Sequence, residues 1–138
     1  MTKKKRTYSI SELSEEFGIT PRTLRFYEDQ KLISPKRDGQ TRIYSTADRA
    51  RLAWILRGKR VGFSIAEMGE VLDMHYQEGG KVKQSQITLE ACRQRIKSLE
   101  QQKKDIDETI EELNNIILSV ENWMMEQNIS NVGDREHA

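Results

Sequence analysis

Side chains suited to binding a nucleic acid gather in the first third of the chain. The segment 19–44, ITPRTLRFYEDQKLISPKRDGQTRIY, places Arg22 and Arg25 on a short predicted helix. An extended stretch after that helix carries Arg42 and Tyr44. The planar guanidinium of arginine can grip a guanine edge or a phosphate through two hydrogen bonds. These residue types favour a DNA-reading helix followed by a phosphate-binding segment.

The net charge of +1 over 138 residues hides a division along the chain. Residues 1–62 hold 15 Lys and Arg against 7 Asp and Glu, a balance of +8; residues 63–138 hold 8 against 15, a balance of −7. A basic half suggests a polyanionic partner, and an acidic half suggests protein contact or plain solubility. Basic residues that merely decorate a solvated surface explain the charge alone equally well.

Two short helices must position the first two arginines. Ser9 and Glu12 have the spacing of a capping box, and the helix that they begin ends at Gly18. Thr20 and Pro21 then mark a second helix start, because threonine caps and proline is tolerated in the first turn. This is helix-turn-helix spacing, in which the second helix is offered to the major groove.

The second helix has an outward and an inward face. Arg22 and Arg25 lie about 60° apart around it. Leu24 and Tyr27 point largely to the other side, where Leu24 can anchor the helix to a core. The alternative is that both arginines lie on a solvated helix, bound to Glu28 or Asp29.

The segment 31–44 loses the helical period and alternates as a strand does after an Asp38-Gly39 turn signal. This pattern predicts a small two-stranded wing. Its cations and a tyrosine hydroxyl suit phosphate contacts, which position a protein on DNA without reading the sequence. The residues concerned are Lys36, Arg37, Arg42 and Tyr44.

A second helical pair is predicted next, with one helix over about 45–61 and another capped by Ser64 and Glu67. Cations cluster at the end of the first of these helices, where they can interact with the negative end of the helix dipole or reach the DNA backbone. Both interpretations stay open. The cluster consists of Arg57, Lys59 and Arg60.

A long heptad pattern follows a linker predicted over 77–82. Residues at alternating steps of three and four form a coiled-coil seam about 47 Å long, too long for this small domain to cover, so a second copy is the expected cover. Lys103 interrupts the seam, where a polar residue can fix register. Cys92, the only cysteine, is interpreted as a small buried residue rather than a sensor thiol. The seam consists of Leu89, Cys92, Ile96, Leu99, Lys103, Ile106, Ile110, Leu113, Ile117 and Val120.

Little in the sequence suggests catalysis or membrane insertion. His75 and His137 are the only histidines, and no paired carboxylate, nucleophile or glycine-rich phosphate loop has a convincing setting. No stretch approaches the roughly 20 apolar residues of a membrane span. We expect a non-enzymatic, cytoplasmic protein associated with the nucleoid, without a cofactor, a metal or a membrane partner.

Five segments follow one another in a specific order: S-I-S-E-L, I-T-P-R-T-L-R-F-Y-E, T-R-I-Y, G-F-S and a long heptad helix. This order, over roughly residues 7–120, resembles the MerR family of transcriptional regulators. The resemblance implies a mainly α homodimer with a winged helix-turn-helix, a second helical pair and a long antiparallel dimerisation coiled coil. The expected domains are DNA binding over 1–76, a linker over 77–82, a dimerisation helix over 83–122 and a short effector or tail segment over 123–138.

The resemblance also implies site residues. Tyr27 would meet a phosphate near the end of the recognition helix, and Lys59 would contact the backbone from the second helical pair. Phe26 stands where many relatives have a second tyrosine, so a hydroxyl contact there is absent. The implied DNA-binding set is Arg22, Thr23, Arg25, Tyr27, Arg37, Arg42, Tyr44 and Lys59.

Members of this family typically bind pseudo-palindromic promoter operators and distort the DNA so that RNA polymerase can engage when an effector arrives. The resemblance therefore implies duplex DNA, RNA polymerase and a second copy of the chain as partners. The alternative is a non-specific architectural DNA-binding protein. The choice between activator and repressor stays open.

The effector is constrained by residue types. Metal-sensing relatives use converging cysteines, and this chain has only Cys92, so a thiolate-metal sensor is not expected. The run L-R-G-K-R-V-G-F-S looks most like the branch that controls leucine, isovalerate and related acyl-CoA catabolism, which implies a small organic or acyl-CoA effector. Tyr76 and Trp123 are candidates for its pocket, with ordinary core packing as the alternative.

Overall fold

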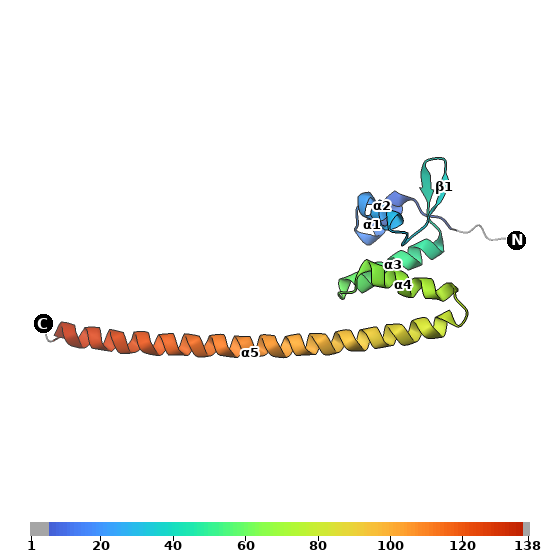
Figure 1. The fold of residues 1–138 in the computed structure, drawn as a ribbon. Helices are drawn as coiled ribbons and strands as arrows, with labels where there is room; N and C mark the ends of the chain where they lie inside the picture. The colour runs from blue at the N-terminus through green and yellow to red at the C-terminus, as the bar shows by residue number, and fades with distance from the viewer. Residues whose placement is uncertain (1–5, 137–138) are drawn as a thin grey trace. The chain divides into compact units, whose positions relative to one another are not determined.

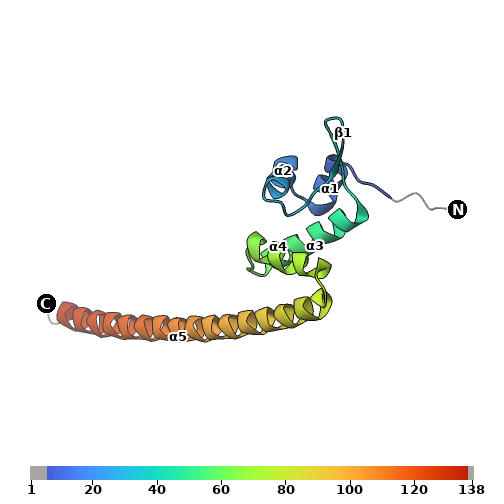
Figure 2. The same cartoon turned by 45° about the vertical axis from the view of Figure 1, so that its right-hand side comes forward.

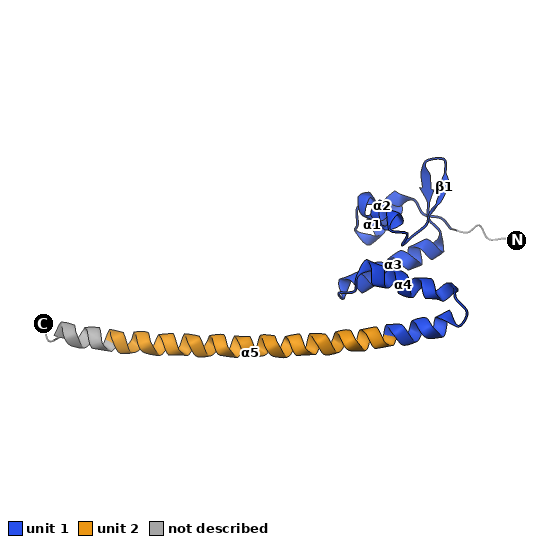
Figure 3. Ribbon diagram, in the orientation of Figure 1, with its two compact units in different colours: residues 1–88 blue, residues 89–138 orange. Residues whose placement is uncertain are grey.

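The structure is a computed structural model that describes residues 6–136, with side chains as far as residue 128. It is mainly helical, as the sequence predicts, and divides into two compact units, residues 1–88 and 89–138 (Figure 3). The elements in chain order are α1 (Ile10–Phe17), α2 (Pro21–Asp29), β1 (Lys36–Asp38), β2 (Thr41–Ile43), α3 (Thr46–Arg60), α4 (Ile65–Asp73), the 3₁₀ helix η1 (Met74–Tyr76) and α5 (Gly80–Glu136) (Figure 1).

Side-chain caps start the helices where their sequences predict. The Ser9 hydroxyl accepts a 3.0 Å hydrogen bond from the Glu12 amide, and the Glu12 carboxylate accepts a 3.1 Å bond from the Ser9 amide. Gly18 ends α1 with φ 65°, a left-handed conformation that costs glycine little. Thr20 caps α2 with Pro21 in its first turn, so the predicted helix-turn-helix is confirmed. Ser45 and Ser64 cap α3 and α4 in the same way.

A shared apolar core holds these helices together. Leu13 from α1, Leu24 from α2 and Leu52 from α3 are fully buried. Each such burial contributes about 1.5–3 kcal/mol. Because α2 turns this face to the core, its opposite face is left exposed. The core consists of Leu13, Leu24, Tyr27, Leu32, Ile33, Tyr44, Leu52 and Ile55.

The predicted wing is present as a hairpin that projects from the first unit (Figures 1 and 2). β1 and β2 pair antiparallel with Arg37 opposite Arg42, and Gly39 makes the turn with φ 62°. An additional contact closes the base of the hairpin. Tyr8 donates a 2.8 Å backbone hydrogen bond to Tyr44 and accepts one of 2.9 Å from it. The N-terminal segment is thus paired with the wing.

The second helical pair, α3 and α4, packs closely. A Cβ atom added at Gly58 of α3 would lie 2.1 Å from the Met68 sulfur, and one added at Gly69 of α4 would lie 2.6 Å from the Leu32 Cδ2. Arg51 of α3 donates hydrogen bonds to the Leu32 carbonyl and, at 2.7 Å, to the Asp73 carboxylate. Small residues and one arginine therefore fix this pair to the segment that follows α2.

Helix α5 differs from the expected domain boundaries. It begins at Gly80, inside the linker predicted over 77–82, and continues through the tail predicted over 123–138 as far as Glu136. Gly79 makes the turn with φ 68°, and Gly80 lies so close to η1 that no side chain fits there. No proline and no glycine interrupt residues 81–132, so the helix has no reason to stop at 122. Residues 137 and 138 lie outside the described part of the chain.

The apolar seam side chains of α5 are exposed to solvent in the single chain. Leu89, Ile96, Leu99, Ile106, Ile110, Leu113, Ile117 and Val120 are between 42% and 58% exposed. Cys92 is likewise exposed in the single chain. Among the residues described, none of the helices combines the length and apolarity that crossing a membrane requires.

Candidate nucleic-acid interface

The outer face of α2 carries two arginines whose guanidinium groups bind no other described side chain. Arg22 and Arg25 are exposed, and within residues 6–136 neither makes a side-chain hydrogen bond or an ion pair. Glu28, which the sequence suggested as a partner for them, instead accepts hydrogen bonds from Arg37 and Arg42. Each arginine therefore keeps all five donors available for an external acceptor.

Thr23 lies between these arginines in sequence and is half-buried. Its amide donates a 3.1 Å hydrogen bond to the Thr20 hydroxyl, and the two hydroxyl oxygens lie 2.9 Å apart. The cap of α2 thus also orients the Thr23 side chain at the start of the recognition helix.

An open hollow of about 490 Å³ joins α2 to the second helical pair. Arg22, Thr23 and Phe26 line it from α2, Lys59 lines it from the end of α3, and Ser64 lines it from the cap of α4. The remaining lining residues are Tyr27, Phe63 and Ile65. The fold therefore brings Lys59 to α2 across more than 30 residues of sequence.

Glu28, in the last turn of α2, binds both arginines of the wing. Its Oε1 accepts a 2.7 Å hydrogen bond from Arg37 Nη2, and its Oε2 accepts a 2.6 Å bond from Arg42 Nε. Glu28 and Arg42 are mostly buried, with side chains 18% and 20% exposed, whereas Arg37 is 46% exposed. Partial burial by itself would raise the pKa of Glu28, but the hydrogen bonds from Arg42 and Arg37 outweigh it and lower the pKa below its ordinary value. The hydrogen bond to Glu28 likewise raises the pKa of Arg42.

The two tyrosines expected to meet phosphates lie in the core instead. Tyr27 is 1% exposed and Tyr44 is fully buried, and neither hydroxyl has a hydrogen-bond partner among the described residues. Burial raises the pKa of Tyr44. Tyr27 follows Leu24 by three residues on the same helical face. The backbone of Tyr44 is paired with that of Tyr8. A phosphate contact by either residue, as expected from the sequence, would require its hydroxyl to leave the core.

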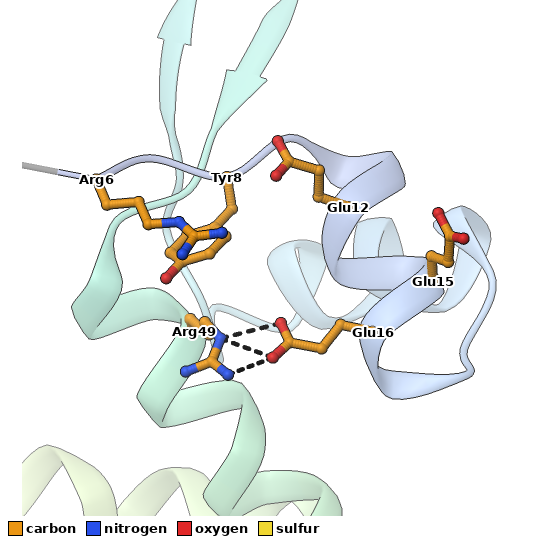
Figure 4. A pocket seen from close by; sticks show the side chains of 6 residues that line it. All are labelled: Arg6, Tyr8, Glu12, Glu15, Glu16 and Arg49. Atoms are coloured by element: carbon orange, nitrogen blue, oxygen red, sulfur yellow. Dashed lines mark hydrogen bonds and ion pairs between the residues drawn. The ribbon is translucent and has the colours of Figure 1, made fainter.

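A second hollow, of about 480 Å³, lies beside α1 and α3 and was not predicted (Figure 4). Arg49 Nε lies 2.9 Å from both carboxylate oxygens of Glu16, and the Arg6 and Arg49 guanidinium groups lie 4.8 Å and 5.6 Å from the centre of the Tyr8 ring. The hydrogen bond from Arg49 lowers the pKa of Glu16. No sequence pattern relates two residues 33 positions apart, which is why this ion pair escaped prediction. Glu12 and Glu15 complete the lining.

The two effector candidates belong to different units. Tyr76 lies in η1, where its ring contacts His75 edge-on with centroids 5.4 Å apart. Trp123 lies on α5, in the second unit. Both side chains are exposed in the single chain, so neither packs in a core there. Within the described residues, no cluster of three or more His, Cys, Asp or Glu is arranged to hold a metal ion.

A helix-turn-helix with exposed arginines, a basic two-stranded wing and a second helical pair define a winged-helix DNA-binding protein. Residues 8–75 match the family model described as MerR HTH family regulatory protein, and residues 49–116 match the model described as MerR, DNA binding. Together the two matches run from the first helix into the heptad helix. The chain belongs to the MerR family of transcriptional regulators.

Named relatives agree with this assignment. The chain is 32% identical over 116 residues to the HTH-type transcriptional activator mta of Bacillus subtilis. The aligned region covers 83% of this chain and 42% of that protein. It is 33% identical over 69 residues to the HTH-type transcriptional regulator ZntR of Escherichia coli, or 49% of each. The chain thus spans about half the length of the curated relatives it matches. These relatives are regulators rather than enzymes.

Solved structures share the fold. A MerR family transcriptional regulator from Bacillus cereus has a TM-score of 0.62 at 21% identity, over 80% of this chain and 79% of that chain. HiNmlR, described as a MerR family regulator lacking the sensor domain and bound to promoter DNA, has a TM-score of 0.57 at 20% identity, over 81% of this chain and 88% of that chain.

Proposed function

We propose that this regulator binds a pseudo-palindromic promoter operator as a homodimer and modulates transcription by distorting the DNA. The proposal rests on the two exposed arginines of α2, which bind no other described side chain. They lie beside a hollow that Lys59 and the cap of α4 also line. Unpaired guanidinium groups on a helix of the right length suit base edges in the major groove. The promoter-DNA complex of HiNmlR supports the same use of the shared fold.

The roles within the interface follow from side-chain chemistry. Arg22 and Arg25 read base edges from α2, and Thr23 contributes a hydroxyl or methyl contact beside them. Lys59 contacts the phosphate backbone as a point charge. Arg37 and Arg42 contact phosphates from the wing while bound to Glu28, whereas Tyr27 and Tyr44 serve the core. This division separates sequence reading from positioning.

Homodimerisation through α5 is the second part of the proposal. The exposed seam side chains repeat at heptad spacing, and covering them with a second copy removes a continuous apolar stripe from water. An antiparallel pairing places two recognition helices at a fixed separation on a two-fold symmetric site. Bending a site of 20–30 base pairs costs on the order of several kcal/mol, which contacts at both half-sites offset.

A small organic or acyl-CoA effector is the third part. The resemblance of the segment 56–64 to acyl-CoA catabolic regulators motivates it, and Tyr76 and Trp123 are the candidate contacts. In a Trp54→Phe variant, Trp123 is the remaining tryptophan. Titration with isovaleryl-CoA should change its fluorescence, while free CoA should not. An unchanged spectrum at millimolar ligand would remove Trp123 from the proposal. RNA polymerase is the proposed partner at the promoter.

Selection of bound fragments from a genomic library tests DNA recognition. We expect enrichment of a site with two-fold symmetry, bound more tightly than random duplex at physiological salt. If no fragment competed better than random duplex, operator recognition would be refuted. The alternative of an architectural DNA-binding protein, favoured by the +8 balance of residues 1–62, predicts that outcome.

A further inference from the structure

One carboxylate joins the recognition helix to both strands of the wing. Arg37 on β1 and Arg42 on β2 are cross-strand partners, and each donates to a different oxygen of Glu28. The two bonds, 2.7 Å and 2.6 Å long, are short and charge-assisted. Glu28 is thus the point at which the orientation of the hairpin relative to α2 is set.

The arrangement differs from an ordinary surface ion pair. Exposed pairs contribute little because water screens them and their side chains lose entropy. Here Glu28 and Arg42 are mostly covered, so both are already ordered by packing. Each guanidinium carries five N–H donors, and its bond to Glu28 uses one of them. The remaining donors of Arg37, whose side chain is 46% exposed, stay available to a phosphate at positions that the carboxylate determines. Arg42, 20% exposed, offers the smaller share of its side chain.

We propose that Glu28 is a positioning residue for DNA binding, which holds the wing and its arginines Arg37 and Arg42 in the geometry that contacts phosphates. This inference rests on the proposed function. It predicts an effect of unusual sign, since removing a negative charge from a DNA-binding surface ordinarily strengthens binding to any duplex. If Glu28 positions the arginines, neutralising it weakens binding instead.

The central experiment compares Glu28→Gln with Asp29→Asn, which makes the same change of charge one residue along the helix. Asp29 is exposed and makes no hydrogen bond to either wing arginine. Affinity is measured by fluorescence anisotropy on the genomic fragment selected above and on a random duplex, between about 50 and 200 mM salt. Glu28→Gln should bind both duplexes about tenfold more weakly, and Asp29→Asn should bind as tightly as the unmodified protein or more tightly.

The salt dependence separates positioning from partial loss of fold. A lost phosphate contact makes the slope of log K against log salt shallower by about 1, so a dimer that loses one contact per wing should lose about 2. A smaller fraction of folded protein lowers affinity without changing this slope. Melting followed by circular dichroism verifies that the variant is folded at the assay temperature; if it is not, Glu28→Asp, which keeps the charge but shortens the reach, replaces it.

A double-variant cycle with Arg37→Gln completes the test. When Arg37 is absent, Glu28 has one arginine fewer to position, so Glu28→Gln should weaken binding less than it does in the unmodified protein. Equal or tighter binding by Glu28→Gln, an unchanged salt slope, or additive effects in the cycle would each overturn the inference. Failure of the unmodified protein to prefer the selected fragment would instead refute the proposed function.

Discussion

Gly80, at the start of α5, lies directly against the backbone of Met74 in η1: a Cβ atom at position 80 would lie 1.7 Å from the Met74 carbonyl oxygen. We therefore expect Gly80→Ala to lower the free energy of unfolding of the first unit by about 1–3 kcal/mol, because the backbone must move to admit a methyl group. Urea unfolding followed by Trp54 fluorescence in a Trp123→Phe background measures this. Lys81→Ala, at an exposed position, should leave the midpoint unchanged.

We expect Arg25→Ala and Lys59→Ala to weaken DNA binding in different ways. Arg25→Ala should cost about 1–3 kcal/mol on the selected operator and little on random duplex, since it removes a base contact. Lys59→Ala should weaken binding to both duplexes similarly and make the salt slope shallower, since it removes a phosphate contact. Competition titrations with both duplexes measure the two patterns. Equal weakening by Arg25→Ala on every duplex would support the architectural alternative.

The buried hydroxyls of Tyr27 and Tyr44 make a prediction about stability. A buried polar group without a partner costs about 1–3 kcal/mol, so Tyr27→Phe and Tyr44→Phe should be neutral or should stabilise the first unit. Because neither hydroxyl reaches the surface, DNA affinity should be unchanged. Denaturation and anisotropy measure the two quantities on the same samples. A phosphate contact by either residue would show itself as weaker binding by its phenylalanine variant.

The ion pair between Glu16 and Arg49 predicts a dependence of stability on pH. Its hydrogen bond lowers the pKa of Glu16 in the folded state below the ordinary 4.5. The stabilisation is therefore fully present above about pH 4.5 and is lost as the pH falls through the lowered pKa. Glu16→Gln should lower the urea midpoint at pH 7, and the difference between the two proteins should disappear as the pH falls below the lowered pKa of Glu16. Glu15→Gln, which removes a neighbouring carboxylate that no described arginine bonds, serves as the control and should follow the unmodified protein.

The seam of α5 predicts the oligomeric state. Sedimentation should give a mass near twice 16.1 kDa, the mass of one chain. Ile110→Asp places a charge in the middle of the seam and should yield the single-chain mass, because an unpaired buried charge is costly. Lys104→Asp, one residue beyond the seam position Lys103, changes the charge by more and should leave the dimer intact. If the unmodified protein were a monomer at micromolar concentration, the hypothesis of dimerisation through the seam would be wrong.

Local sequence signals predicted the helices and the wing, because each signal acts within three or four residues. The Ser9 and Glu12 cap and the Asp38-Gly39 turn are of this kind, and both are present in the structure. Contacts between distant residues carry no such signal. Glu28 lies 14 residues from its partner Arg42. The sequence suggested Arg22 and Arg25 as partners instead, because they are closer along the chain.

The same limitation applies to the burial of Tyr27 and Tyr44. The resemblance implied a phosphate contact for Tyr27, and the hydroxyl of Tyr44 suggested one, while the burial of both residues depends on what packs against them. For Tyr27, the helical period already placed its side chain beside Leu24, and that physical argument agrees with the structure. Tyr44 lies in a core shared with residues from α1, α2 and α3, and its backbone pairs with Tyr8; no local sequence pattern predicts either contact.

The pairing of Tyr8 with Tyr44 also bears on how the domain folds. The two residues are 36 positions apart, so their bridge closes a loop of chain that contains α1, α2 and the whole wing. Closing a loop of that length carries an entropic cost that the two backbone bonds alone do not repay, so the enclosed helices must already be packed when it forms. We therefore expect the pairing of Tyr8 with Tyr44 to form last on the folding pathway and to open first when the domain unfolds.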